Sequence, residues 1–217
     1  MDFFEGKDLD CLVLINPDNP TGNYISRKGM LKLARWTKEK NIRFLADESF
    51  VDFSEEAEPT LLVEELLDEN PHMIVVKSIS KSYGIPGLRL GVAASGDTDL
   101  IGQLKKDVAI WNINSFGEFY MQIEEKYRKD YDSALDKLRG ERTRFAEKLS
   151  NLPGVCVFPS QANYLMVELT DKSISATEIT ELLLTRYNLF IKDLSSKISR
   201  NGRQFLRIAI RNEAEDN

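Results

Sequence analysis

Histidine and cysteine, from which most transition-metal sites and disulfide frameworks are built, are scarce in this sequence. Its 217 residues include one histidine and two cysteines. Cys11 and Cys156 lie far apart in apolar runs, so we expect two buried free thiols rather than a disulfide or a metal pair. His72 follows Pro71 and is expected to be a turn residue rather than a base or a ligand. The sequence therefore predicts no metal site.

An excess of basic residues and long apolar runs are also absent. Acidic residues outnumber basic ones by 35 to 29, for a net charge of −6, which offers no electrostatic surface for nucleic acid or for an anionic membrane. No apolar run approaches the roughly 20 residues of a membrane span, and the first residues lack the basic region and apolar core of a signal peptide. We therefore expect a folded cytoplasmic protein that binds neither nucleic acid nor membrane.

Short apolar runs alternate with segments of helical periodicity in the first half of the chain. The run at residues 11–15 is continuous, as in a strand buried on both faces, and Ser26 can cap the helix that follows it. This alternation predicts an α/β fold with a mainly parallel, doubly wound sheet, in which ligands bind outside the carboxyl ends of the strands. Further strands are predicted at residues 44–46, 73–76 and 90–94, and helices at 27–40 and 61–68.

The second half of the chain has a different pattern. Residues 116–152 are highly charged, with apolar residues at helical spacing, and predict one long helix or two abutting helices. The pattern that follows is typical of a small α+β domain, with strands at residues 155–158, 163–167, 189–191 and 205–210 and a helix at 175–187. We therefore expect a large domain at 1–115, a connecting helical segment at 116–150 and a small C-terminal α+β domain at 151–217.

Four polar motifs follow or precede the predicted strands. They are Asn-Pro-Asp-Asn-Pro-Thr-Gly at 16–22, Asp-Glu-Ser-Phe at 47–50, Ser-Ile-Ser-Lys at 78–81 and Gly-Leu-Arg-Leu-Gly at 87–91. In this order and at these distances, they resemble the class I/II aminotransferases and their relatives among the fold-type-I pyridoxal-phosphate enzymes. The resemblance spans residues 10–211. It implies that the first domain is part of a cofactor-binding large domain and that the cofactor is pyridoxal 5'-phosphate.

The resemblance assigns roles around the cofactor ring. Lys81 matches the lysine that holds the cofactor as a Schiff base and afterwards moves protons. Asp47 matches the aspartate that pairs with the pyridine nitrogen and keeps the ring able to accept electrons. Asn19 matches the asparagine that hydrogen-bonds the phenolic oxygen of the ring. Lys81 and Asp47 are thus the expected catalytic residues, and both also bind the cofactor.

The resemblance also implies two anion sites. Arg89 matches the arginine that binds the cofactor phosphate, and Ser78 and Ser80 match hydroxyls on the same anion, although a plain turn role for the serines stays open. Arg207 is the lone charge on one face of a predicted strand and matches the arginine that binds the substrate carboxylate. Arg211, on the same predicted strand face, extends that anion site or reaches solvent. Asn163 resembles a residue near the same pocket.

Tyr164, which follows Asn163, is expected to pack in the core. Phe50 stands where many aminotransferases have a tyrosine, so a hydroxyl contact to the cofactor is lost. Around Phe50 and Arg89 the sequence looks most like the branch that contains histidinol-phosphate aminotransferase and threonine-phosphate decarboxylase. Branch members bind a phosphorylated amino acid, and Lys192 stands where an arginine is usual. The lysine keeps the positive charge but not the planar fork.

The expected reaction is amino transfer between an amino acid and a 2-oxo acid, in a homodimer with sites at its interface. Decarboxylation of a phosphorylated amino acid is the alternative, because both reactions use the same scaffold and differ in how the substrate is posed. The sequence matches the family without its N-terminal portion, so we expect a fragment of a longer enzyme. A catalytically silent scaffold is the third possibility.

Overall fold

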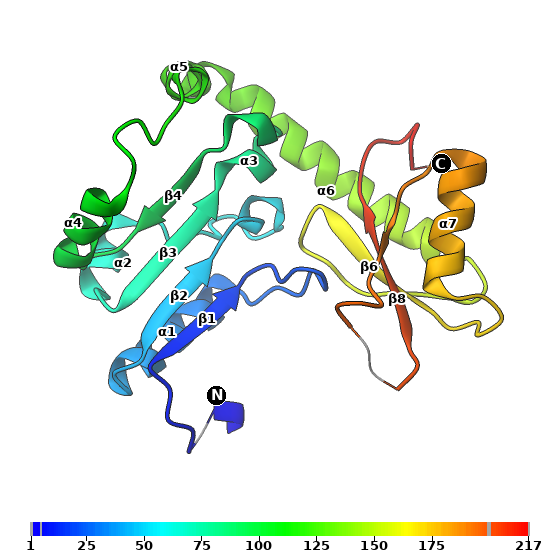
Figure 1. The fold of residues 1–217 in the computed structure, drawn as a ribbon, viewed down its shortest axis with the longest axis horizontal. Coiled ribbons are helices and arrows are strands. Elements are labelled where there is room, and N and C mark those ends of the chain that lie inside the picture. Colours follow the sequence, from blue (N-terminus) through cyan, green and yellow to red (C-terminus); the bar gives the residue numbers. More distant parts are fainter. Residues whose placement is uncertain (1, 5, 199–200, 217) are drawn as a thin grey trace. The chain divides into compact units, whose positions relative to one another are not determined.

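The computed structural model describes residues 2–4, 6–198 and 201–216 (Figure 1). It contains two compact units. The first comprises Met1–Pro17 and Tyr24–Asp132, and the second comprises Asp18–Asn23 and Ser133–Asn217. The expected division at residues 115 and 150 stays a prediction.

The sheet of the first unit has four strands in the order β1 (Cys11–Ile15), β2 (Arg43–Asp47), β3 (Met73–Ser78) and β4 (Gly91–Ala94). The first three strands are parallel, and β4 runs antiparallel to β3. The α/β class expected from the sequence is therefore confirmed, in a mixed sheet. Parallel strands in register bring the carboxyl ends of β1, β2 and β3 to one edge.

Helices connect these strands. The α-helices are α1 (Arg27–Glu39), α2 (Glu64–Glu69), α3 (Ile79–Ser82), α4 (Thr98–Asp107) and α5 (Ser115–Ile123). The 3-10 helices are η1 (Asp2–Phe4), η2 (Val51–Phe53), η3 (Pro86–Leu88) and η4 (Glu124–Tyr127). The helix α4 was not predicted; it begins where Asp97 accepts a hydrogen bond from the Leu100 N–H at 3.0 Å. Among the described residues, no helix is both long enough and apolar enough to cross a membrane.

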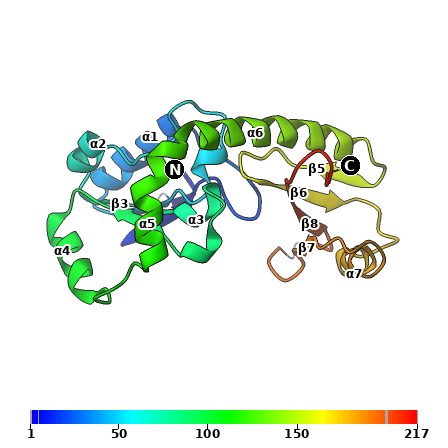
Figure 2. The ribbon, with the colours of Figure 1, turned by 90° about the horizontal axis from the view of Figure 1, so that it is seen from above.

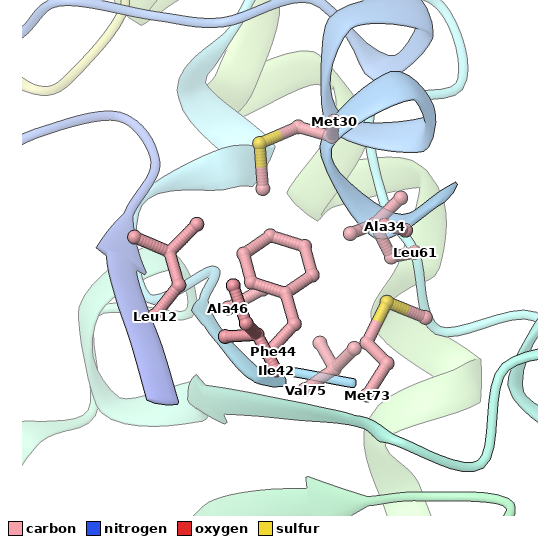
Figure 3. Close-up of a cluster of buried hydrophobic side chains, with 9 residues drawn as sticks. All are labelled: Leu12, Met30, Ala34, Ile42, Phe44, Ala46, Leu61, Met73 and Val75. Atoms are coloured by element: carbon pink, nitrogen blue, oxygen red, sulfur yellow. The ribbon is translucent and has the colours of Figure 1, made fainter. Parts of the chain in front are cut away.

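The core of the first unit lies between the sheet and α1 (Figure 3). Alternate residues of β2 and β3 face this core, including Phe44 and Val75, both fully buried, and Met30 of α1 packs among them. The expectation that residues 11–15 are buried on both faces is wrong. Leu12 is 7% exposed but Val13 is 60% exposed, because successive side chains of a strand point to opposite faces. Cys11 shares the exposed face, so it is a free but exposed thiol.

The second unit has an antiparallel sheet in the order β5 (Val155–Val157), β6 (Tyr164–Leu169), β8 (Gln204–Ala209) and β7 (Lys192–Asp193). Its helices are α7 (Ala176–Tyr187) and most of α6 (Arg128–Ser150), which begins in the first unit and continues without a break (Figure 2). Phe145 of α6 packs with Leu165, Val167 and Ile210 in one core cluster.

Two expectations for the second unit are wrong. Cys156 is exposed rather than buried, because it lies on the outward face of β5, which pairs only with β6 in the sheet. The strand expected at 189–191 is instead the two-residue β7. Asn188 adopts a left-handed conformation with φ of 55° at the end of α7, and the chain that follows it stays exposed through Phe190 before it pairs with β8.

Candidate active site

The carboxyl edge of the first sheet gathers five of the residues singled out in the sequence. Asp47 ends β2 and Ser78 ends β3, in the parallel register that pairs Asp47 with Val76. Ser80 and Lys81 lie in α3, directly after β3. Arg89 comes just before β4, whose first residue pairs with Ser78. The topology thus brings the expected ring aspartate, the lysine and the phosphate-binding residues to one edge of one sheet.

Lys81 presents a free amine at this edge. Its side chain is exposed, and it has no hydrogen-bond or ion-pair partner among the described residues. It lies on a helix of four residues that follows β3 without a loop. Attack on an aldehyde requires an accessible amine nitrogen that carries no proton, and this side chain is accessible.

The Asp47 carboxylate is held by the main chain that follows it. Its Oδ1 accepts a hydrogen bond from the Ser49 N–H at 2.9 Å. The Ser49 hydroxyl in turn accepts one from the Ser78 N–H at 3.1 Å. One carboxylate oxygen is therefore fixed by the protein. The other has no partner among the described residues and can pair with a protonated ring nitrogen.

The candidate phosphate ligands differ in whether their side chains already have hydrogen-bond partners in the protein. Arg89 is exposed, has a positive φ of 57° and donates to the Pro86 carbonyl at 3.3 Å, with no carboxylate partner among the described residues. A left-handed arginine is uncommon and costs about 1–2 kcal/mol relative to the right-handed form. Ser80 is buried and its hydroxyl donates to the Leu90 carbonyl at 3.4 Å, which favours the structural role left open for it. The Ser78 hydroxyl has no partner among the described residues.

Arg207 of β8 is the centre of a second polar group, in the second unit. Its guanidinium donates to Oδ1 of Asn19 at 2.8 Å and lies 5.1 Å from the ring centroid of Tyr164. Among the described residues it has no carboxylate partner. The positive charge is therefore oriented by an amide and an aromatic face but not neutralised, and it can bind an anion.

Tyr164 does more than pack in the core. It is 3% exposed, as expected, but its hydroxyl also donates to the Asp18 carbonyl at 2.8 Å. Burial raises the pKa of Tyr164, so the hydroxyl stays protonated and keeps donating. This hydrogen bond holds the loop that carries Asn19. Sequence reasoning missed it because it joins residues 146 positions apart.

Gly22 lies where the same loop contacts the rest of the second unit. Its φ is 74°, and a Cβ at this position would lie 2.1 Å from the hydroxyl oxygen of Ser160. The Gly22 carbonyl accepts a hydrogen bond from the Gln161 N–H at 2.9 Å. Only glycine has both the backbone freedom and the small size for this contact. The glycine of the Asn-Pro loop is therefore required by the structure of the second unit.

For Arg211 and Asn163, the structure gives no side-chain contact with the polar group around Arg207 among the described residues. The expectation that Arg211 lies on the strand face of Arg207 is wrong, because β8 ends at Ala209. Arg211 is exposed and forms an ion pair with Glu215 at 3.0 Å. The main-chain carbonyl of Asn163 accepts from the Ile210 N–H at 3.0 Å, and its side chain is partly buried.

Lys192 of β7 lies directly opposite Arg207 in the antiparallel register of β7 and β8. Residues paired in this way have neighbouring side chains on the same face of the sheet, and two like charges there repel each other. A bound anion would relieve this repulsion. Lys192 is therefore a neighbour of Arg207, the arginine expected to bind the substrate carboxylate.

The chemistry of these donors and acceptors fits pyridoxal 5'-phosphate. Lys81 would supply an amine for the aldehyde, Asp47 an acceptor for the protonated ring nitrogen, and Arg89 with Ser78 donors for the phosphate. In contrast, no three histidine, cysteine, aspartate or glutamate side chains of the described residues cluster as metal ligands would.

Comparisons with known proteins agree with the resemblance. The model of the family "Aminotransferase class I and II" matches residues 5–217. The L-serine phosphate decarboxylase of Sulfurospirillum multivorans is 36% identical over 222 residues, which cover 99% of this chain and 55% of that protein. The CMP-5'-(3-aminopropyl)phosphonate synthase of Streptomyces rubellomurinus is 34% identical over 214 residues, 99% of this chain and 33% of that protein. The solved structure of a decarboxylase from Sulfurospirillum multivorans matches with a TM-score of 0.86 and 35% identity, covering 100% of this chain and 61% of that one.

These comparisons correct the expected reaction. Amino transfer was expected, but a decarboxylase of a phosphorylated amino acid and a decarboxylase structure stand among the most similar proteins. The chain spans 55% and 33% of the length of these two curated relatives. The family and its cofactor, pyridoxal 5'-phosphate, follow from the family match and from the relatives. The chain belongs to the class I and II aminotransferase family.

Proposed function

We propose that this chain is part of a pyridoxal-phosphate-dependent decarboxylase of a phosphorylated amino acid. The observation that carries the cofactor assignment is the gathering of Lys81, Asp47 and Arg89 at one sheet edge. The similarity to an L-serine phosphate decarboxylase supports the choice of reaction. Because the chain covers about half of that relative, the proposal concerns the whole enzyme to which these residues belong.

The residues of this chain have distinct tasks in such a reaction. Bound pyridoxal phosphate supplies an electron sink for the bond that breaks at the substrate Cα. Lys81 would hold the cofactor through its amine and would carry the proton that the product receives at Cα. The Asp47 carboxylate would accept a hydrogen bond from the ring nitrogen and so hold a proton there. Decarboxylation balances if carbon dioxide leaves Cα and a proton takes its place.

The cations of the second unit suit the anionic groups of a phosphorylated amino acid. Arg207 is oriented by Asn19 and Tyr164, and Lys192 is its direct neighbour across the β7–β8 pairing. We assign the substrate's anionic groups to this pair. Because the bond that breaks is set by the pose of the substrate, these cations would influence the reaction by fixing that pose.

Isotope release tests the reaction. The enzyme is incubated with pyridoxal phosphate and L-serine phosphate labelled with carbon-13 in its carboxyl group, once without and once with a 2-oxo acid. We expect labelled carbon dioxide and the corresponding amine phosphate in equal amounts, with no need for the 2-oxo acid. Transfer of the amino group to the 2-oxo acid without release of label would contradict the proposal. Unphosphorylated L-serine, the matched control substrate, should release little label.

A further inference from the structure

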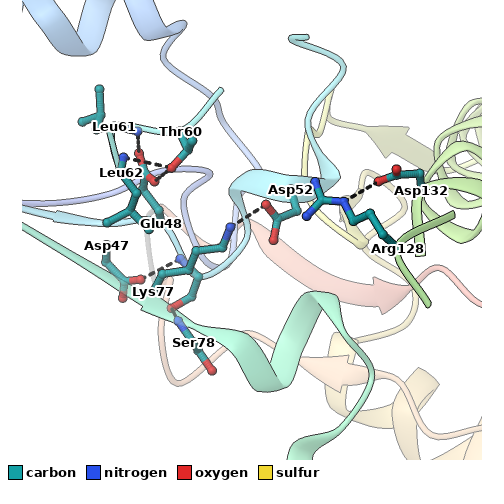
Figure 4. A network of polar contacts seen from close by, with 11 residues as sticks. Asp47, Glu48, Asp52, Thr60, Leu61, Leu62, Lys77, Ser78, Arg128 and Asp132 are labelled. Atoms are coloured by element: carbon teal, nitrogen blue, oxygen red, sulfur yellow. Dashed lines mark hydrogen bonds and ion pairs between the residues drawn. The ribbon is translucent and has the colours of Figure 1, made fainter. Parts of the chain in front are cut away.

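A partly buried ion pair lies behind the carboxyl edge of the first sheet. Lys77 Nζ donates to Asp52 Oδ1 at 2.6 Å, and their side chains are only 14% and 16% exposed (Figure 4). Lys77 immediately precedes Ser78 and lies four residues before Lys81. Asp52 lies five residues after Asp47. The pair therefore joins the two segments that carry the candidate cofactor residues.

The direction of the side chains separates this pair from the candidate cofactor site. Lys77 follows Met73 and Val75 at alternate positions of β3, and these two residues face the core beneath α1. Ser78, one residue later, belongs to the opposite face. Asp52 lies in η2 between Val51 and Phe53, which are both buried and anchor the helix. The ion pair thus lies on the covered face of the sheet.

Further contacts hold the same two segments. The Glu48 N–H donates to the Val76 carbonyl at 2.8 Å. The buried Glu48 carboxylate accepts from the Thr60 hydroxyl at 2.6 Å and from the Leu61 N–H at 2.7 Å. These bonds fix the start of the segment that follows Asp47. The Lys77 contact holds a later part of the same segment, at Asp52.

The turn that carries Lys81 is tied in a similar way. Tyr83, at the end of α3, stacks on Tyr131 with ring centroids 4.2 Å apart and planes 9° from parallel. Both tyrosines line a cavity of about 540 Å³ together with Lys77 and Asp52. The ion pair and the stacked rings therefore surround one space beside the Lys81 turn.

We infer that the Lys77–Asp52 pair is a positioning element that holds the segment after Asp47 against the segment that carries Lys81. A buried ion pair offers little net stability over an apolar pair of similar volume, but it tolerates little change in geometry. The pair therefore fixes the positions of two backbone segments relative to each other. Lys77 holds the segment just before Ser78, and Asp52 holds the segment five residues after Asp47. The cofactor part of this inference rests on the proposed function.

The test separates positioning from stability with three variants. Lys77→Met removes one partner and leaves the partly buried Asp52 carboxylate without its lysine. The double variant Lys77→Met with Asp52→Leu removes both charges, so its thermal stability should return toward that of the wild type. Arg43→Met is the matched control, because Arg43 forms an ion pair with Asp97 at 3.1 Å at the opposite end of the same sheet.

Two measurements are made at a temperature at which circular dichroism shows every variant to be folded. Amide hydrogen exchange in the cofactor-free chain follows peptides that cover residues 47–53 and 78–84. The dissociation constant of pyridoxal phosphate is measured by its absorbance change. In both Lys77 variants we expect about tenfold faster exchange in these peptides and about tenfold weaker cofactor binding, the equivalent of about 1.4 kcal/mol. Arg43→Met should change neither quantity.

The outcomes distinguish this inference from the proposed function. Unchanged exchange in the two peptides of the Lys77 variants overturns the inference, whatever the cofactor does. A double variant that regains both stability and wild-type exchange also overturns it, because the effect would then be one of stability alone. Faster exchange in the Lys77 variants supports the inference even if the wild-type chain fails to bind the cofactor; that failure would count against the proposed function.

Discussion

The guanidinium of Arg207 donates a hydrogen bond to Oδ1 of Asn19 at 2.8 Å, although 188 residues separate them in the chain. Since Oδ1 accepts this bond, the amide nitrogen of Asn19 is a donor, and it has no partner among the described residues. The pair thus fixes the orientation of both side chains within the second unit.

Replacing Arg207 by glutamine should lower kcat/KM for a phosphorylated amino acid about 10–100-fold, because a charge-assisted hydrogen bond contributes about 1.5–3 kcal/mol. The matched control is Arg211→Gln. The partner of Arg211 is Glu215, and both side chains are at least half exposed, so the control should change kcat/KM by less than about twofold. Steady-state kinetics of decarboxylation measure both variants. Equal losses would show that Arg207 has no special role.

Gly22→Ala should destabilise the second unit by about 3 kcal/mol, from left-handed strain of about 1–2 kcal/mol and overpacking against Ser160 of about 1–3 kcal/mol. Gly140 lies within α6 of the same unit, and a Cβ there meets nothing within 4 Å. Gly140→Ala should therefore stabilise the unit by about 0.5–1 kcal/mol. Urea unfolding measures both changes, and a shared sign would refute this account of the loop.

His72 lies in a turn, as expected, but its ring also contacts α1. Nε2 lies 3.0 Å from the Ala34 carbonyl and 3.1 Å from the Thr37 hydroxyl oxygen. Nδ1 is buried without a hydrogen-bond partner. The carbonyl requires that Nε2 carry the proton, so a second proton would have to enter at Nδ1, where no described group accepts it. Desolvation accordingly lowers the pKa of His72 from its ordinary value of 6.5.

This lowered pKa predicts how stability depends on pH. The unfolded chain binds a proton at His72 more readily than the folded chain does. His72 therefore contributes stability above pH 6.5 that is lost as the pH falls from 6.5 through the lower folded pKa. Because His72 is the single histidine, His72→Gln should flatten this part of the profile of unfolding free energy. A pKa at or above 6.5, read from the imidazole proton resonances, would contradict the prediction.

The sequence was sufficient to predict the grouping of Asp47, Ser78 and Lys81. Each lies at or just after the end of an apolar strand, and parallel strands carry such ends to one edge. The order of strands and the antiparallel direction of β4 were not predictable, because hydrophobic pattern does not record strand direction. The exposed face of β1 was missed for a related reason. A continuous apolar run such as residues 11–15 does not show which of its faces another segment covers.

Contacts between residues far apart in the chain also could not be predicted from the sequence. The Arg207–Asn19 and Tyr164–Asp18 hydrogen bonds join residues 188 and 146 positions apart, and no local pattern marks them. In the sequence, Lys77 and Asp52 are marked only as charges between apolar residues, a pattern that many exposed side chains also show. The reaction was misjudged because transamination and decarboxylation share the residues around the cofactor and differ in the pose of the substrate.

The most direct test of the account is to add pyridoxal phosphate to the purified chain, record the visible spectrum, reduce with borohydride and map the labelled peptide. The account predicts an imine band and reduced cofactor fixed on Lys81. Lys81→Ala should lose both while its unfolding free energy changes by less than about 0.5 kcal/mol, since the side chain is exposed. Absence of the band, or label scattered over surface lysines and unchanged in Lys81→Ala, would contradict the assignment of Lys81 as the cofactor lysine.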